Sequence, residues 1–305
     1  TVQPTHGQFN TRVAISGTSL RGGGAQVTSV SLAGIAVKQI VDETDTLVNV
    51  IADASNPVVG DAILIADSGA IVSAENVWSY ATAGAIVNFA PTSGQFRTVV
   101  TISGTDLLEG DETIFEVTLA GIEASVTTSS NTEIVVAAGE GSTVVGQAQI
   151  VLQSGAMITS ANDWTYIARG AIVSVTPNFG TTGTTVDIVG TNLLGGGEAL
   201  LSVSLAGIDA EIGAFVEGKT HNEAISIVVS APNNHARHTS DVVVTANSGA
   251  VTTLVDGWTY VEFAVIHQLT PAQGQENTDV DISGVYLFGG GTSVTTVTLA
   301  GLEAV

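Results

Sequence analysis

Val13-Ala-Ile-Ser-Gly-Thr-Ser-Leu20 decides the fold of this chain, because related stretches occur three more times. They are Val100-Thr-Ile-Ser-Gly-Thr-Asp-Leu107, Val186-Asp-Ile-Val-Gly-Thr-Asn-Leu193 and Val280-Asp-Ile-Ser-Gly-Val-Tyr-Leu287. The central glycines, Gly17, Gly104, Gly190 and Gly284, are separated by 87, 86 and 94 residues (17 to 104, 104 to 190, 190 to 284). Similarity at a nearly fixed period indicates a tandem repeat, so the other motifs are interpreted by their place in it.

Further landmarks keep the same spacing and give the bounds of each repeat. A proline precedes every copy, Leu-Ala-Gly-Ile or Leu-Ala-Gly-Leu follows it, and Trp-x-Tyr closes each complete repeat. We therefore predict repeats at 1–80, 81–168 and 169–262, an insertion between 205 and 248 in the third, and the truncated first half of a fourth at 263–305. The remaining landmarks are Pro4, Pro91, Pro177, Pro271, Trp78, Trp164, Trp258, Tyr80, Tyr166 and Tyr260.

Each repeat is rich in short segments of alternating character. Val13 and Ile15 flank Ala14, and the corresponding residues of later repeats alternate with Thr or Asp, which is typical of a half-buried strand. Such strands recur about every ten residues between Gly, Asn, Asp and Ser, a pattern that predicts an all-β fold of tandem immunoglobulin-like β-sandwiches. The short, constant connections between repeats predict a linear rod with similar joints.

The charge of the chain excludes some classes of partner. Seven basic residues stand against 29 acidic ones, for a net charge of −22. Nucleic acids and anionic membranes are bound by clusters of Lys and Arg, so we expect neither as a partner. The sequence shows no transmembrane run, so we also expect no membrane insertion in this segment. The chain has no cysteine, hence no disulfide and no thiolate metal site or nucleophile.

The insertion of the third repeat holds the strongest candidate metal ligands. His221, His235 and His238 lie there with Glu217 and Glu223 nearby, and a His-x-x-His pair can bind a cation. The spacing fits no common zinc motif, which favours an exposed loop. We expect no metal, no cofactor and no catalytic residue.

Other motifs also have a structural interpretation that is favoured over a functional one. The glycine runs at 22–24, 195–197 and 289–291 lack the Lys that follows in a phosphate-binding loop, and are interpreted as turns. The Trp-x-Tyr pairs are interpreted as core or junction residues rather than a sugar platform. The acidic segment Glu109-Gly-Asp-Glu112 is interpreted as a solvated face rather than a Ca²⁺ site.

The order of these motifs resembles a known family. Pro-x-x-Gly, Ile-Ser-Gly-Thr-x-Leu, Val-x-Leu-Ala-Gly-Ile, Ser-Gly-Ala and Trp-x-Tyr are together similar to the IPT/TIG domain, the immunoglobulin-like fold of plexins, some transcription factors and many microbial surface proteins. The resemblance covers essentially the whole chain and implies a binding or structural module of the microbial cell-surface type. No repeat has the Arg-rich loop with which the transcription-factor branch contacts DNA, so that function is not carried over.

These observations leave three hypotheses for the function. The first is a non-enzymatic structural protein, the repeating segment of an extracellular stalk or surface filament, whose partners are other copies of the chain or further repeats. The second is an adhesin that binds carbohydrate or a surface protein through the insertion of the third repeat. The third is a set of accessory modules of a secreted polysaccharide-active enzyme. All three place the protein outside the cell or on its surface.

Overall fold

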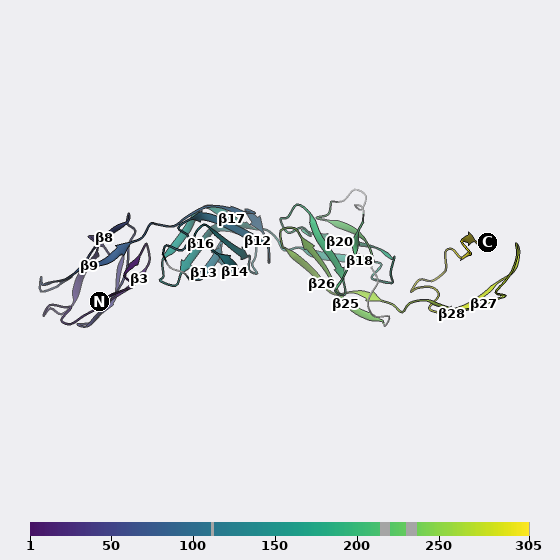
Figure 1. Ribbon diagram of the computed structural model, residues 1–305, viewed down its shortest axis with the longest axis horizontal. Coiled ribbons are helices and arrows are strands. Elements are labelled where there is room, and N and C mark those ends of the chain that lie inside the picture. Colours follow the sequence, from purple (N-terminus) through teal and green to yellow (C-terminus); the bar gives the residue numbers. More distant parts are fainter. Residues whose placement is uncertain (111–112, 214–219, 230–236, 305) are drawn as a thin grey trace. The chain divides into compact units, whose positions relative to one another are not determined.

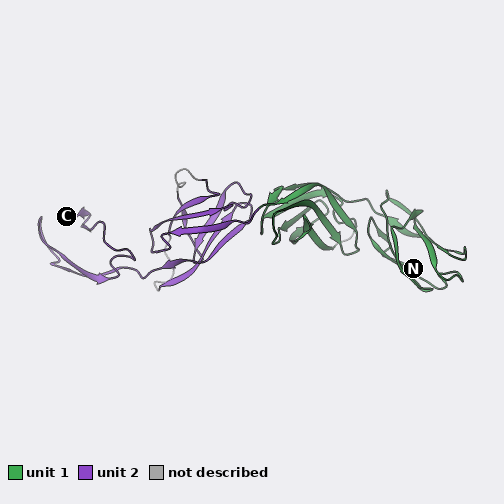
Figure 2. Cartoon of the chain, turned by 180° about the vertical axis from the view of Figure 1, so that it is seen from behind, with its two compact units in different colours: residues 1–167 green, residues 168–305 purple. Residues whose placement is uncertain are grey.

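The computed structural model describes residues 1–305 except 111–112, 214–219, 230–236 and 305, and it divides into units of residues 1–167 and 168–305 (Figures 1 and 2). Every regular element among the described residues is a β-strand. The predicted all-β immunoglobulin-like fold is therefore confirmed. The described residues include no helix long and apolar enough to cross a membrane.

Repeat 1 is a sandwich of two sheets. Their strand orders are β1-β3-β7-β6 and β2-β9-β8-β4-β5. Its strands are β1 (Val2–Gln3), β2 (His6–Gly7), β3 (Arg12–Ser16), β4 (Val27–Leu32), β5 (Ile35–Ala36), β6 (Gln39–Glu43), β7 (Leu47–Ile51), β8 (Val58–Ala66) and β9 (Ile71–Tyr80).

Repeat 2 has the same arrangement, except that one long strand belongs to both of its sheets. The continuous order is β10-β12-β15-β14-β13-β16-β17-β11, and β14 pairs with both β13 and β15. The strands are β10 (Ala85–Ala90), β11 (Ser93–Gly94), β12 (Val99–Thr105), β13 (Ile114–Leu119), β14 (Ile122–Ser129), β15 (Glu133–Ala137), β16 (Val144–Leu152) and β17 (Met157–Tyr166).

Unit 2 contains repeat 3 and the start of repeat 4. The sheet orders in repeat 3 are β18-β20-β24-β23 and β19-β26-β25-β21-β22, and repeat 4 has two pairs, β27-β28 and β29-β30. The strands are β18 (Ala171–Thr176), β19 (Phe179–Gly180), β20 (Thr185–Thr191), β21 (Leu200–Leu205), β22 (Ile208–Asp209), β23 (Glu211–Ile212), β24 (Ala224–Val228), β25 (His238–Ala246), β26 (Val251–Tyr260), β27 (Val265–Thr270), β28 (Asp281–Val285), β29 (Thr298–Leu299) and β30 (Leu302–Glu303).

The first strand of each complete repeat is divided between the two sheets at its landmark proline. In repeat 1, β1 runs antiparallel to β3, whereas β2 runs parallel to β9 in the other sheet. The peptide bond before each of the four landmark prolines is cis. Gly7 then lies against the side chain of Thr11, whose hydroxyl accepts a hydrogen bond from the backbone N–H of Gln8 at 2.9 Å. The Pro-x-x-Gly motif therefore marks the transfer of the chain between sheets.

The central glycine of the repeated stretch allows two strands to approach closely. A Cβ on Gly104 would meet the carbonyl oxygen of Ala85 on the neighbouring strand β10, and would come within 2.6 Å of the Leu107 side chain. Gly190 and Gly284 are confined in the same way by the strands that precede them. Glycine is needed here for close packing of the backbone.

The Leu-Ala-Gly-Ile motif forms a tight hairpin turn. Ala33 and Gly34 both have positive φ, 49° and 83°, as do the Ala-Gly pairs of the other three repeats. Positive φ at both central residues is the type I′ geometry, which matches the right-handed twist of paired strands. The motif thus fixes the pairing of β4 with β5, and of the corresponding strands later in the chain.

Candidate functional site

The structure places two of the three candidate histidines of the third repeat. His221 lies in a turn before β24, and His238 is the first residue of β25. No group of three or more His, Cys, Asp or Glu among the described residues could hold a metal ion. His235 and Glu217 lie outside the described residues, as does much of the insertion.

The three Trp-x-Tyr pairs lie inside the sandwiches. The Trp and Tyr rings of each pair meet edge to face, with centroids 5.5 to 5.8 Å apart. In repeat 2, Trp164 also meets the ring of Phe89, at 6.4 Å. Because all six side chains are buried, none of them offers a surface on which a sugar could stack.

Repeats 1 and 2, which share unit 1, are joined through a loop and a hairpin. The loop at residues 8–12 lies against the turn between β16 and β17, which carries the Ser-Gly-Ala landmark of repeat 2. The bonds run from Arg12 N to Ser154 O (2.9 Å), from Met157 N to Phe9 O (3.2 Å) and from Asn10 Nδ2 to Gly155 O (3.0 Å). Gly155 lets the loop approach, since a Cβ there would lie 3.1 Å from the Arg12 side chain.

Gln8 holds the beginning of the linker, residues 81–84 between β9 and β10, against repeat 1. Its buried side-chain amide donates hydrogen bonds to the carbonyl oxygens of Ser55 (2.7 Å) and Ala81 (2.9 Å). Its Oε1 accepts from the backbone N–H groups of Phe9 and Ser55. This side chain therefore joins the end of β9 to two loops of repeat 1.

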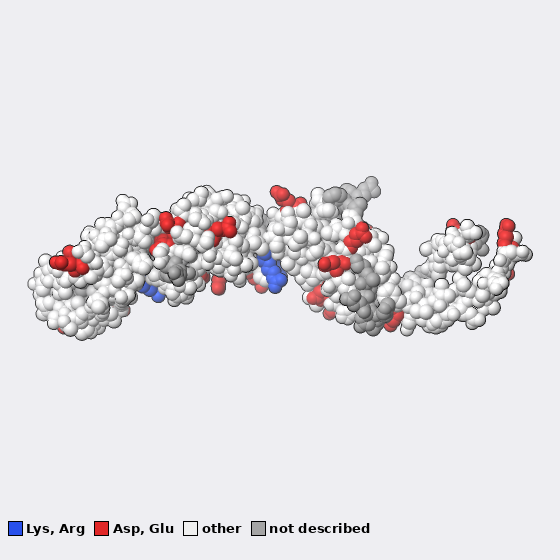
Figure 3. Space-filling model, viewed as in Figure 1, with Lys and Arg blue, Asp and Glu red and all other residues white. Residues whose placement is uncertain are grey.

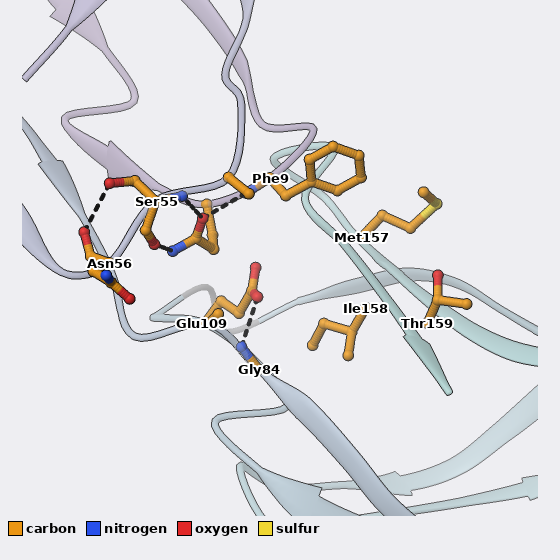
Figure 4. Close-up of a pocket in the computed structure, with 11 residues that line it drawn as sticks. Phe9, Ser55, Asn56, Gly84, Glu109, Met157, Ile158 and Thr159 are labelled. Carbon is orange, nitrogen blue, oxygen red and sulfur yellow. Dashed lines mark hydrogen bonds between the residues drawn. The ribbon is translucent and has the colours of Figure 1, made fainter. Parts of the chain in front are cut away.

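Glu109 reaches the joint from repeat 2. It lines a cleft of about 450 Å³ with residues of both repeats and of the linker (Figure 4). Oε1 accepts a hydrogen bond from the backbone N–H of Gly84 at 2.8 Å, while Oε2 is buried without a partner. The cleft is lined by Gln8, Phe9, Ala54, Ser55, Asn56, Ala83, Gly84, Glu109, Met157, Ile158 and Thr159.

The interpretation of Glu109 as part of a solvated face is wrong. Only 5% of its surface is exposed, and burial raises the pKa of its carboxyl group to about 7. The hydrogen bond from Gly84 opposes this rise in pKa, and the nearby charge of Asp106 adds to it. A signal was present in the sequence, because Glu109 takes the place that Gly22, Gly195 and Gly289 have in the other repeats.

Charged side chains do not gather into a site on the face shown in Figure 3. Acidic groups are scattered over both units, and basic groups are few. The one ion pair described, Arg21 with Glu43 at 2.9 Å, is local to repeat 1. The distribution is that of a solvated acidic surface.

Comparison with known families identifies the second repeat. Residues 85–166 match the IPT/TIG domain model, with bounds that coincide with the strands β10 to β17. The family indicated by the repeated motifs is therefore confirmed by a match within the repeat where the joint and its cleft are described. No curated protein matches the chain.

Three solved structures to which the chain is similar are distant from it in sequence. The full extracellular region of plexin A4 is 16% identical with a TM-score of 0.41; the match covers 88% of this chain but only 29% of that protein. The SGBP-B protein of a xyloglucan utilisation locus in Bacteroides uniformis is 17% identical, with 61% and 54% covered and a TM-score of 0.26. The I9–I11 tandem of titin is 9% identical, with 85% and 95% covered and a TM-score of 0.26. These likenesses concern the fold alone.

Proposed function

Since its second repeat is an IPT/TIG domain, we propose that this chain is a non-enzymatic structural segment of a stalk or filament at the cell surface. In this proposal the sandwich is a spacer, and its copies are joined end to end by joints of one type. The partners are further repeats or other copies of the chain. The surface location is part of the proposal, and it is supported by the resemblance to the cell-surface members of the family.

The observation that carries the proposal is a contact that recurs within both units. In unit 1, His6 Nε2 lies 3.3 Å from the carbonyl oxygen of Gly110 in the next repeat. In unit 2, a Cβ on Gly290 would lie 3.1 Å from the ring of Phe179, so this ring packs on the corresponding turn of repeat 4. His6 and Phe179 both stand two residues after a landmark proline, and Gly110 and Gly290 are equivalent turn glycines.

The non-enzymatic part of the proposal is supported by the roles of the buried polar side chains. Gln8 binds backbone groups of loops and the linker. Thr11 and Thr98 each accept a backbone hydrogen bond at 2.9 Å within the same type of turn. These polar groups stabilise turns and a joint, which is what a spacer requires.

Small-angle X-ray scattering of residues 1–305 tests the spacer role. Strands of ten residues are about 33 Å long, so three sandwiches end to end extend over roughly 100 Å and give a radius of gyration of about 30 Å. A compact protein of this length would have a radius of gyration of about 19 Å. We expect a value near 30 Å and a distance distribution with a long tail.

A matched variant distinguishes repeats that are held by fixed joints from repeats that are connected by flexible linkers. Inserting a Gly/Ser tract after Thr82 adds slack to the linker that Gln8 and Glu109 hold. The insertion is expected to broaden the distance distribution of the parent chain. A radius of gyration near 19 Å, or a parent distribution as broad as that of the variant, would contradict the proposal.

A further inference from the structure

Glu109 occupies a backbone conformation that suits glycine. Its φ is 44°, and the glycines at the same place in the other repeats, Gly22, Gly195 and Gly289, have φ of 52°, 51° and 53°. A side chain other than Gly, Asn or Asp is uncommon in this left-handed region. Repeat 2 thus keeps the turn of its neighbours and adds a carboxyl group to it.

The added carboxyl group is placed where an ionised carboxylate is unfavourable. It is directed into the cleft that the linker and both repeats line, with Oε1 on Gly84 and Oε2 without a partner (Figure 4). A buried polar atom without a hydrogen bond is costly, and a buried charge without a counter-ion is more so. The neutral carboxyl group avoids the cost of burying a charge without a counter-ion.

The charged and titratable groups around the cleft do not neutralise Glu109. Asp106, on the same turn, carries charge of the same sign and raises its pKa further. His6 and Glu109 line a second pocket between repeats 1 and 2, and His6 Nε2 lies 3.3 Å from Gly110 O. Lys38 lies over the Phe9 ring and donates to Asn10. Among the described residues, no basic group forms an ion pair with Glu109.

A metal ion does not fit this site as well as a proton does. Calcium takes six to eight oxygen ligands, usually including several carboxylates. The described residues around the cleft supply one carboxylate, and no group of three acidic or histidine side chains occurs among them. A proton needs only the carboxyl group itself.

We propose that Glu109 makes the joint between repeats 1 and 2 sensitive to pH, the protonated carboxyl group keeping the linker docked and its ionisation loosening the joint. This inference adds a property of one joint to the structural role. It depends on contacts within unit 1 and does not require that the whole chain be a rod.

The direction and size of the effect follow from linkage between docking and proton binding. The pKa of the carboxyl group is about 7 when docked, and would return to about 4.3 when exposed in an undocked joint. Docking is therefore strongest at pH values below the lower pKa, weakens as the pH rises between the two, and is constant above the higher one. Between pH 5 and pH 8 the docking equilibrium constant should fall by about a hundredfold.

The absence of cysteine allows the joint to be measured in the full chain. Cysteines introduced at exposed Ser29 in repeat 1 and exposed Ser125 in repeat 2 carry a pair of spin or fluorescent labels. At pH 5 we expect a narrow distance distribution between the labels. At pH 8 it should broaden, with most of the change falling between pH 5 and pH 7.

Two variants assign the transition to one group. Glu109→Gln keeps an oxygen acceptor for Gly84 but does not ionise, so its distribution should stay narrow at both pH values. His6→Gln removes the histidine beside the joint and should leave the transition in place. The proposal is overturned by an unchanged wild-type distribution, by a transition that survives in Glu109→Gln, or by one that disappears in His6→Gln. Scattering by the same samples reports separately whether the chain is extended.

Discussion

Replacing Trp164 by Ala is expected to destabilise repeat 2 by about 3–5 kcal/mol. The Trp164 side chain is fully buried and meets the rings of Tyr166 and Phe89. Alanine removes the indole and leaves a cavity between two sheets that are fixed by their own hydrogen bonds. Its partners can therefore collapse only partly into the space, and both their packing and the burial of apolar surface are lost.

Peptide-resolved hydrogen exchange measures the loss of stability of repeat 2 in the intact chain. A single unfolding midpoint would be hard to interpret, because the chain contains several repeats. The slowest amides of β12 and β15 should exchange about 10²–10⁴ times faster in Trp164→Ala. Phe115→Ala is the matched control, because Phe115 is an aromatic residue of the same repeat with 66% of its surface exposed. Its effect should stay within about 0.5 kcal/mol. Equal effects of the two substitutions would contradict the assignment of Trp164 to the core.

Gly104→Ala is expected to destabilise repeat 2 by about 2–3 kcal/mol, a large effect for the addition of one methyl group. The new Cβ would meet the carbonyl oxygen of Ala85 and the side chain of Leu107. The first of these is backbone, held by the pairing of β10 with β12, so it cannot rotate away. Relief requires the two strands to separate and their hydrogen bonds to lengthen. Peptide-resolved hydrogen exchange over residues 85–105 measures the change.

A second glycine of the same repeat separates crowding from the general cost of losing glycine. Gly121 has a φ of 79° and no atom within 4 Å of a Cβ placed there. Asparagine tolerates that conformation, so Gly121→Asn should cost about 1 kcal/mol or less. If Gly104→Ala were as mild as this substitution, the close approach of β10 and β12 would not be the reason for glycine at this position.

Much of the fold could be predicted from the sequence because each landmark has a local physical reason. Ala33-Gly34 forms a type I′ turn from residues that are adjacent in the chain. The alternation around Val13 and Ile15 places both side chains in the core, as period two requires of a strand with one buried face. Four copies of these signals in one register make the assignment robust to an error in any one of them.

The sequence could not predict how many strands form after the Leu-Ala-Gly-Ile turn of each repeat. Repeat 2 has one continuous strand, β14, where repeat 1 has the two strands β5 and β6. Both segments mix apolar and polar residues, and hydrophobic periodicity does not distinguish a strand that changes sheets from two strands with a break. Whether the chain bends there depends on backbone pairing with both neighbours at once, as the partners of β14 show.

The sequence by itself determined that one sandwich is repeated. Turn glycines, alternating apolar residues and Trp-x-Tyr each depend on residues that lie close together in the sequence. Tertiary structure alone decided what Glu109 does. In the sequence it stands in an acidic segment of the kind that usually faces water. In the fold it is buried in the cleft that the linker and both repeats line, with a hydrogen bond from Gly84. Burial is a property of what surrounds a group in space, and residues from four separate segments of the chain line the cleft around this one.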